Sequence, residues 1–308
     1  MINTFDQLIA EAKKISSKRP RPVRVVVTAG NDKAALSALI EANKLGIADG
    51  LLIGDKNLIL QTLEEMGEKD IDQCKIIEEP DESSICKRAI QTIHNGEAEI
   101  ILKGKVKSAS LLRAAFDSEH GLRSGRIISD TLVFEFPQRP GENKLIMITD
   151  GGFNLSPDLK EKIQILENAV QVAHALGNKN PKVAVLSAAE TVHPNLQSAV
   201  DAAIISKMND RGQIKGCVVD GPLALDNAIS EQAARVKGIK SPVAGQADIL
   251  LCPDIESANI SAKATTYFAQ LRLAHATMGA KAPILIPSRN DTADAKLLTI
   301  ALNVVIFG

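Results

Sequence analysis

The chain has 308 residues, and its 36 Lys and Arg residues against 37 Asp and Glu residues give a formal net charge of −1. This balance offers no electrostatic reason to bind nucleic acid or an anionic membrane surface. Hydrophobic residues make up 45% and charged residues 24% of the chain, which indicates an ordinary globular protein and excludes global low-complexity disorder.

The first third of the chain alternates short apolar strands with amphipathic helices. In chain order we expect a helix over 4–17, a strand over 23–27, a helix over 33–45, a strand over 50–54, a helix capped by Asp55, a helix over 82–95 and a strand over 99–102. Such alternation predicts βαβ units with right-handed crossovers. The expected class is therefore α/β, with a mostly parallel sheet between two helical layers in a three-layer αβα arrangement.

In the middle of the chain, the alternation of strands and helices is interrupted. Strands over 130–136 and 145–149 are separated by a turn-like segment, which predicts a hairpin that begins a second domain. Alternation then resumes, with a long helix from Ser156, a strand over 183–186, a helix over 195–208, strands over 216–219 and 249–251, a helix over 263–277, and final apolar runs over 283–286 and 303–306.

Several sequence signals are absent. The four cysteines have no CxxC spacing, and neither a signal peptide nor an apolar run of about 20 residues is found, so we expect a cytoplasmic protein with reduced thiols and no membrane span. The chain lacks GxGxxG, GxxxxGK[ST] and HExxH. This weakens a Rossmann dinucleotide enzyme, argues against P-loop chemistry, and makes a catalytic metal unexpected.

Ligands of parallel α/β sheets bind beyond the carboxyl ends of the strands, so residues that follow strands are the candidates for function. Lys103 and Gly104 follow the strand at 99–102, and Ser108 is the expected cap of a helix over 109–116. Lysines and free backbone N–H groups at a helix start suit a phosphate. A solvated loop with a structural glycine is the alternative.

A second candidate segment, over 121–126, places two arginines among glycines. Arg126 can bind an anion through its planar guanidinium, although an exposed arginine in a salt bridge is the alternative.

Three further segments carry polar groups after strands. Residues 149–157 contain two glycines and the Ser156–Pro157 pair, which predicts a helix start, although a purely structural turn is the alternative. Asp220 and Asn259 follow later strands, and we interpret them as polar walls of a substrate pocket rather than metal ligands.

The segment over 284–294 is the richest candidate. Ser288, Arg289, Asp291 and Asp294 follow one strand and open a helix. Arginine can hold an oxyanion, serine can donate to it, and aspartate can accept a proton. The alternative is a helix cap formed by Asp291 or Thr292 beside an incidental arginine.

The motifs LKGKVKSASLL, GLRSGRIISD, DGPLALDNA, GQADILLCPDIESANI and APILIPSRNDTADAKLLTIAL together resemble the phosphate acetyltransferase/phosphate butyryltransferase family. GLRSGR and SRNDTADAK place the resemblance closer to the butyryltransferase branch. The similarity extends over nearly the whole chain.

The resemblance implies a fold similar to the isocitrate and isopropylmalate dehydrogenases, with two α/β domains that face a cleft. The first domain would comprise residues 1–125 and 278–308, and the second residues 126–277. The resemblance also implies a homodimer or higher homo-oligomer. The implied reaction is acyl-CoA + phosphate ⇌ acyl phosphate + CoA, with coenzyme A as substrate or product and no metal or permanently bound cofactor.

The resemblance also assigns roles to residues. Ser288 and Arg289 would contact phosphate and the transition state, while Lys103 and Arg126 would contact phosphate or the CoA pyrophosphate. A free thiol has a pKa near ~8.5, so CoA needs a base to attack an acyl phosphate. Both Asp291 and Asp294 lie where the family has its catalytic aspartate; we favour Asp294 as the base and Asp291 as the cap.

Three other functions remain open from the sequence. The first is phosphate acetyltransferase activity, because acetyl and butyryl groups differ by only two methylenes. The second is an NAD- and metal-dependent hydroxy-acid dehydrogenase of similar fold, which would need clustered aspartates that the sequence does not display. The third is a non-catalytic acyl-CoA-binding protein, against which the Ser288–Arg289 pair argues.

Overall fold

The computed structural model describes residues 1–68, 74–139, 142–288 and 290–308. Its contacts divide the chain into two compact units. Unit 1 comprises Met1–Thr4 and Ile127–Leu273, and unit 2 comprises Phe5–Arg126 and Ala274–Gly308. Within the described ranges, no helix has both the length and the apolar composition that crossing a membrane requires.

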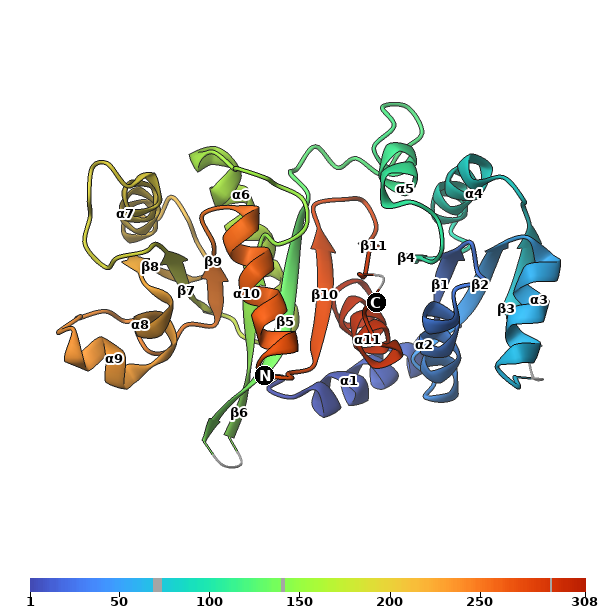
Figure 1. The fold of residues 1–308 in the computed structure, drawn as a ribbon, viewed down its shortest axis with the longest axis horizontal. Helices are drawn as coiled ribbons and strands as arrows, with labels where there is room; N and C mark the ends of the chain where they lie inside the picture. The colour runs from blue at the N-terminus through green and yellow to red at the C-terminus, as the bar shows by residue number, and fades with distance from the viewer. Residues whose placement is uncertain (69–73, 140–141, 289) are drawn as a thin grey trace. The chain divides into compact units, whose positions relative to one another are not determined.

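Unit 2 is built on a parallel sheet in the order β11-β4-β1-β2-β3 (Figure 1). Its strands are β1 (Val23–Thr28), β2 (Ala48–Gly54), β3 (Cys74–Glu78), β4 (Ile100–Lys103) and β11 (Ile284–Leu285). Its helices are α1 (Phe5–Ser17), α2 (Lys33–Lys44), α3 (Lys56–Glu65), α4 (Glu82–His94), α5 (Ser108–Ala115) and α11 (Ala293–Phe307).

Helices cover both faces of the unit 2 sheet. Val26 on β1 packs in a core with α4 and α5, whereas the neighbouring Val25 and Val27 point to the opposite face and are equally buried. Helix α11 packs against both α1 and α2. Burial at successive positions of one strand is typical of a parallel sheet between two helical layers.

Helix caps fix where several of these helices begin. The Asp32 side chain accepts a hydrogen bond from Ala35 N at the start of α2, and Asp55 accepts one from Leu58 N at the start of α3. The expected cap at Asp55 is therefore confirmed.

The second sheet has the order β10-β5-β6-β9-β7-β8. Five of its strands lie in unit 1: β5 (Ser129–Arg139), β6 (Glu142–Thr149), β7 (Lys182–Leu186), β8 (Val218–Leu223) and β9 (Ile249–Leu251). Of the edge strand β10 (Leu273–Met278), only Leu273 belongs to unit 1, and Ala274–Met278 belong to unit 2. The helices of unit 1 are α6 (Leu159–Ala175), α7 (Gln197–Asp210), α8 (Leu225–Ile229), α9 (Glu231–Val236) and α10 (Ile255–Tyr267).

Strands β5 and β6 form the expected antiparallel hairpin, and β6, β9, β7 and β8 pair in parallel. One face of the sheet packs on small residues of the short helices, such as Ala228 on α8, Ala234 on α9 and Ala258 on α10. Mixed α/β architecture with parallel sheets, as the sequence predicts, is thus observed.

Two expected elements are wrong. The helix expected over 263–277 is α10, which begins earlier, after its cap Asp254, and is followed by strand β10; Leu273 is buried in the sheet core. The apolar run at 303–306 forms the end of α11. Helix α6 does not start at Ser156, because Asp158 forms a capping box with Glu161.

Candidate active site

Two of the predicted segments lie side by side at the carboxyl edge of the unit 2 sheet. Strands β4 and β11 are parallel neighbours, with Leu102 opposite Leu285. Lys103 is the last residue of β4, and we name residues 103–108 the Lys103 segment. Ser288 follows β11. Because parallel strands end at the same edge, sequence positions that are more than 180 residues apart are brought to one place.

Lys103 and Gly104 shape the loop after β4. The Lys103 side chain is only 7% exposed, and its Nζ donates to the backbone oxygens of Gly104 (3.0 Å) and Val106 (3.4 Å). A Cβ at Gly104 would lie 2.3 Å from the Thr28 backbone oxygen, and Gly104 N donates to that same oxygen at 3.0 Å. Glycine is therefore required here so that the loop can pass close to β1.

Ser108 is not the helix cap. Helix α5 begins at Ser108 itself, and Lys107 occupies the N-cap position without a side-chain capping hydrogen bond. The prediction was wrong because the helix starts one residue earlier than expected, so Ser108 takes the first helical position instead of the cap. Ser108 is exposed, so its hydroxyl is left at the start of α5.

The segment after β11 forms a closed turn around Ser288. Asp291 Oδ2 accepts a hydrogen bond from Ser288 N (2.7 Å), and Asp291 N donates to Ser288 O (3.1 Å). The buried Lys296 on α11 donates from Nζ to the Asp291 backbone oxygen at 2.6 Å. We name Ser288 together with Asn290 and Asp291 the Ser288 turn. Arg289 lies outside the described residues.

The two aspartates of this segment differ in their surroundings. Thr292, not Asp291, caps α11, because its side chain accepts a hydrogen bond from Ala295 N. The expected cap role of Asp291 is therefore wrong, and its carboxylate binds the Ser288 amide instead. Asp294 lies in the first turn of α11 and is exposed.

His275 on β10 is a neighbour of this site that the sequence did not indicate. Its Nε2 lies 3.6 Å from Asp291 Oδ2. From the sequence, His275 was expected within a helix, and the histidines were considered only as metal ligands. No local pattern could have revealed a contact between residues 16 positions apart in the sequence.

The 121–126 segment runs beside the chain that leads into β11. The Ser124 hydroxyl donates to the Gly279 backbone oxygen, and Lys281 N donates to Leu122 O at 2.8 Å. Arg126 ends the segment, and its side chain is exposed. The segment is thus anchored through its backbone and Ser124, leaving Arg126 at the surface of unit 2.

The predicted pocket residues Asp220 and Asn259 lie in unit 1, on β8 and α10. Asn259 Nδ2 donates to the Gly151 backbone oxygen at 3.0 Å, which joins it to the glycine segment after β6. Asp220 Oδ1 accepts from Gly221 N at 2.8 Å. Asp220 lies within β8, whereas the sequence predicted it after the strand. Strand β7 separates β8 from β9, the strand before α10, so neighbouring strand ends do not bring the two residues together.

Asp150, within the glycine segment after β6, is a second aspartate that closes a turn. Its carboxylate accepts hydrogen bonds from the backbone N–H groups of Gly152 (3.0 Å) and Asn154 (2.9 Å), and it is 4% exposed. Burial is the largest influence on its pKa and raises it; the nearby Asp130 charge raises it further, while the hydrogen bonds lower it. The sequence predicted a turn here but not this carboxylate environment.

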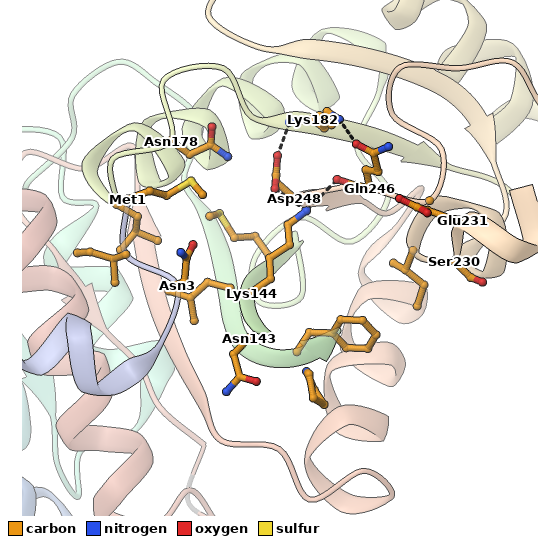
Figure 2. Close-up of a pocket in the computed structure, with 18 of the residues that line it drawn as sticks. Met1, Asn3, Asn143, Lys144, Asn178, Lys182, Ser230, Glu231, Gln246 and Asp248 are labelled. Carbon is orange, nitrogen blue, oxygen red and sulfur yellow. Dashed lines mark hydrogen bonds and ion pairs between the residues drawn. The ribbon is translucent and has the colours of Figure 1, made fainter. Parts of the chain in front are cut away.

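A separate cavity of about 970 Å³ lies at the opposite, amino edge of the unit 1 sheet (Figure 2). Lys144 forms an ion pair with Asp248 (2.7 Å) and donates to Gln246 O (2.8 Å), while Lys182 N donates to Asp248 (2.7 Å). These polar groups bind one another rather than pointing jointly at an empty position. Ligands of parallel sheets bind at the other edge, so we do not assign the active site here.

Comparison with known proteins identifies what the chain resembles. Residues 81–304 match the family model described as phosphate acetyl/butaryl transferase. A phosphate butyryltransferase of Clostridium acetobutylicum is 42% identical, covering 100% of this chain and 99% of that protein, and a phosphate acetyltransferase of Thermotoga maritima is 39% identical, covering 95% and 98%. The crystal structure of a branched-chain phosphotransacylase from Enterococcus faecalis matches with a TM-score of 0.82 at 29% identity, covering 92% and 99%.

Proposed function

Because the chain belongs to the phosphate acetyl/butaryl transferase family, we propose that it transfers a short acyl group between coenzyme A and inorganic phosphate, with butyryl preferred. The reaction is acyl-CoA + phosphate ⇌ acyl phosphate + CoA. The observation that carries the proposal is the meeting of the Ser288 turn and the Lys103 segment at the ends of adjacent strands. Hydroxyl and cationic groups gathered at one sheet edge suit a phosphate anion.

Transfer would be direct, within a complex that holds both substrates. In the direction of acyl-CoA synthesis, the CoA sulfur loses its proton to a base and attacks the acyl carbonyl carbon; the new C–S bond forms, the C–O bond to phosphate breaks, and phosphate leaves. Ser288 and Arg289 would stabilise the charge that develops on the carbonyl and phosphate oxygens. Holding the reacting groups together supplies most of the acceleration.

We assign the base to Asp294. The Asp291 carboxylate already accepts the Ser288 amide and faces His275, whereas Asp294 is exposed in the first turn of α11. An aspartate that is accessible to a substrate thiol can accept its proton, while one engaged in the turn serves to shape the site.

The remaining predicted residues would bind substrate. Cationic Lys103 and Arg126 suit phosphate or the CoA pyrophosphate, although Lys103 also holds its own loop. The set that we propose as substrate-binding comprises Lys103, Gly104, Ser108, Arg126, Asp220 and Asn259.

Phosphate acetyltransferase activity is the second candidate, favoured by the 39% identity to the Thermotoga maritima enzyme. One methylene in an apolar pocket is worth about 1 kcal/mol, so a pocket built for butyryl should favour butyryl-CoA over acetyl-CoA by at least ~10-fold in kcat/KM. A series from acetyl-CoA to isovaleryl-CoA with phosphate, followed by CoA release, measures this preference. A maximum at acetyl-CoA would replace butyryl in the proposal.

Direct transfer makes a separate prediction. Protein incubated with radiolabelled butyryl-CoA and then denatured should carry no label. Label retained by the denatured chain would replace direct transfer with an acyl-enzyme mechanism.

We further propose a homodimer, a cytoplasmic location and a fold similar to the isocitrate and isopropylmalate dehydrogenases. The family resemblance supports all three, and the passage of the chain from unit 2 into unit 1 and back is consistent with the last. Sedimentation of the purified chain would test the oligomer.

A further inference from the structure

His275 contacts the Ser288 turn from outside it. The His275 and Asp291 side chains are 16% and 15% exposed, and His275 Nε2 lies 3.6 Å from Asp291 Oδ2. This distance is too long for a strong hydrogen bond but brings a protonated imidazole into charge contact with the carboxylate.

Asp291 transmits this contact to Ser288. The carboxylate oxygen that faces His275 is the same Oδ2 that accepts the Ser288 amide at 2.7 Å. Whatever holds Oδ2 in place therefore also holds the backbone of Ser288. Lys296 holds the other side of the turn, through the Asp291 backbone oxygen.

Helix α11 fixes both partners through a stripe of buried polar residues. Lys296, Thr299 and Asn303 are spaced by three and four positions, so they share one face of an otherwise apolar helix. Thr299 Oγ1 accepts from His275 N (3.1 Å), and Asn303 Nδ2 donates to His275 O (2.8 Å). One helix thus ties down the His275 backbone and, through Lys296, the Ser288 turn.

We propose that His275 is a positioning residue for the acyl transfer, which holds the Asp291 carboxylate on the Ser288 amide and so keeps the Ser288 turn in its reactive geometry. The inference rests on the proposed function, because it takes Ser288 as catalytic. In this role His275 acts through its contact with Asp291 and not on the substrate. Misplacement of a catalytic group by about 1 Å can cost ~10²-fold in rate, so losing one support should cost less.

Steady-state kinetics of His275→Gln, Asp291→Asn and the double variant test the chain of contacts. We expect His275→Gln to lower kcat about 10-fold while KM for butyryl-CoA stays within about twofold, since substrate binding does not involve His275. If His275 acts through Asp291, the double variant should be no slower than Asp291→Asn. His174→Gln, a change of the same kind on α6, should leave kcat unchanged. The proposal would be overturned if the loss of kcat in the double variant equals the product of the two single losses. Full activity of His275→Gln would also overturn it.

Hydrogen exchange of the Ser288 amide, followed by NMR in the full chain, gives a readout that does not need activity. We expect the amide to exchange faster in His275→Gln than in the unchanged chain, while Gly152 in unit 1 exchanges equally in both. Equal exchange at Ser288 would overturn the positioning role even if the enzyme is active. An inactive unchanged chain would instead overturn the proposed function and leave the exchange result to decide the contact. Should His275→Gln not fold, His275→Asn carries the same expectations.

Discussion

Two turns, one in each unit, use an aspartate carboxylate to organise the backbone after a strand, but their surroundings differ in charge. In unit 2, Asp291 accepts the Ser288 amide and has His275 and Lys296 beside it. In unit 1, the buried Asp150 binds the amides that follow it and has the carboxylate of Asp130 as its charged neighbour.

The difference explains why we assign the chemistry to one turn. The buried cation Lys296 beside the Ser288 turn favours binding of a phosphate, whereas an anion near Asp130 and Asp150 would lie next to two carboxyl groups. With this assignment, the same backbone arrangement would support the proposed reactive site in one unit and local structure in the other.

The largest effect should come from the base. Asp294→Asn removes the proposed proton acceptor but keeps the size of the side chain, and general-base catalysis contributes roughly 10²- to 10⁴-fold. We expect kcat for acyl-CoA synthesis to fall about 10³-fold. Asp158→Asn in unit 1, where asparagine still caps α6, should stay near full activity. Turnover of Asp294→Asn within twofold of the unchanged chain would move the base elsewhere.

Removing the charge-stabilising groups should cost somewhat less. Ser288→Ala and Arg289→Ala should each lower kcat by about 10²-fold, the usual scale for a transition-state donor. Ser156→Ala is the matched control, because Ser156 is an exposed serine that follows the turn closed by Asp150, and it should leave kcat unchanged. Loss of activity in the control but not in the two variants would reverse the contrast between the turns.

Substitution of Asp150 should change the stability of the chain rather than its activity. Burial raises the pKa of Asp150, so its stabilising contribution is full below the unfolded value of about 3.9 and is lost as pH rises through the raised folded value. The urea midpoint of Asp150→Asn should therefore rise relative to that of the unchanged chain between pH 4 and pH 7.

Asp81 provides a control of opposite sign. Hydrogen bonds from Ser84 lower the pKa of Asp81, so its contribution is present above the unfolded value and is lost as pH falls. The urea midpoint of the unchanged chain should therefore rise relative to that of Asp81→Asn between pH 4 and pH 7. Parallel trends for Asp150→Asn and Asp81→Asn would refute the assigned environment of Asp150.

The smallest effect concerns the cysteines. Burial raises the pKa of Cys86 and Cys217 to about 11 and that of Cys252 to about 12, where nearby Asp254 adds to the rise. The thiolate is the reactive form, so these thiols should react slowly with a disulfide reagent at pH 8 until the chain is unfolded. Cys252→Ala should keep its turnover within about twofold. Rapid labelling of Cys252 in the folded chain would contradict its burial.

Much of unit 2 and the edge that carries the proposed site could be predicted from the sequence. Local signals such as the apolar run at Val23–Thr28 and the cap Asp55 depend on near neighbours and placed the strands and helices well. Because ligands gather where parallel strands end, those strands then pointed to Lys103 and Ser288.

Long-range packing decided what the sequence missed. Leu273–Met278 forms a strand because pairing within the sheet outweighs the local propensity of the segment. Val304 is helical because α11 is buried on nearly all sides. His275 reaches Asp291 only once β10 and α11 are packed together. Such contacts leave no periodic pattern in one sequence.

The most direct test of the proposed activity is product formation by the unchanged chain from butyryl-CoA, with and without inorganic phosphate. We expect CoA release only when phosphate is present, with one butyryl phosphate trapped by hydroxylamine for each CoA released. Release of CoA without phosphate, or no release in either case, would contradict acyl transfer to phosphate.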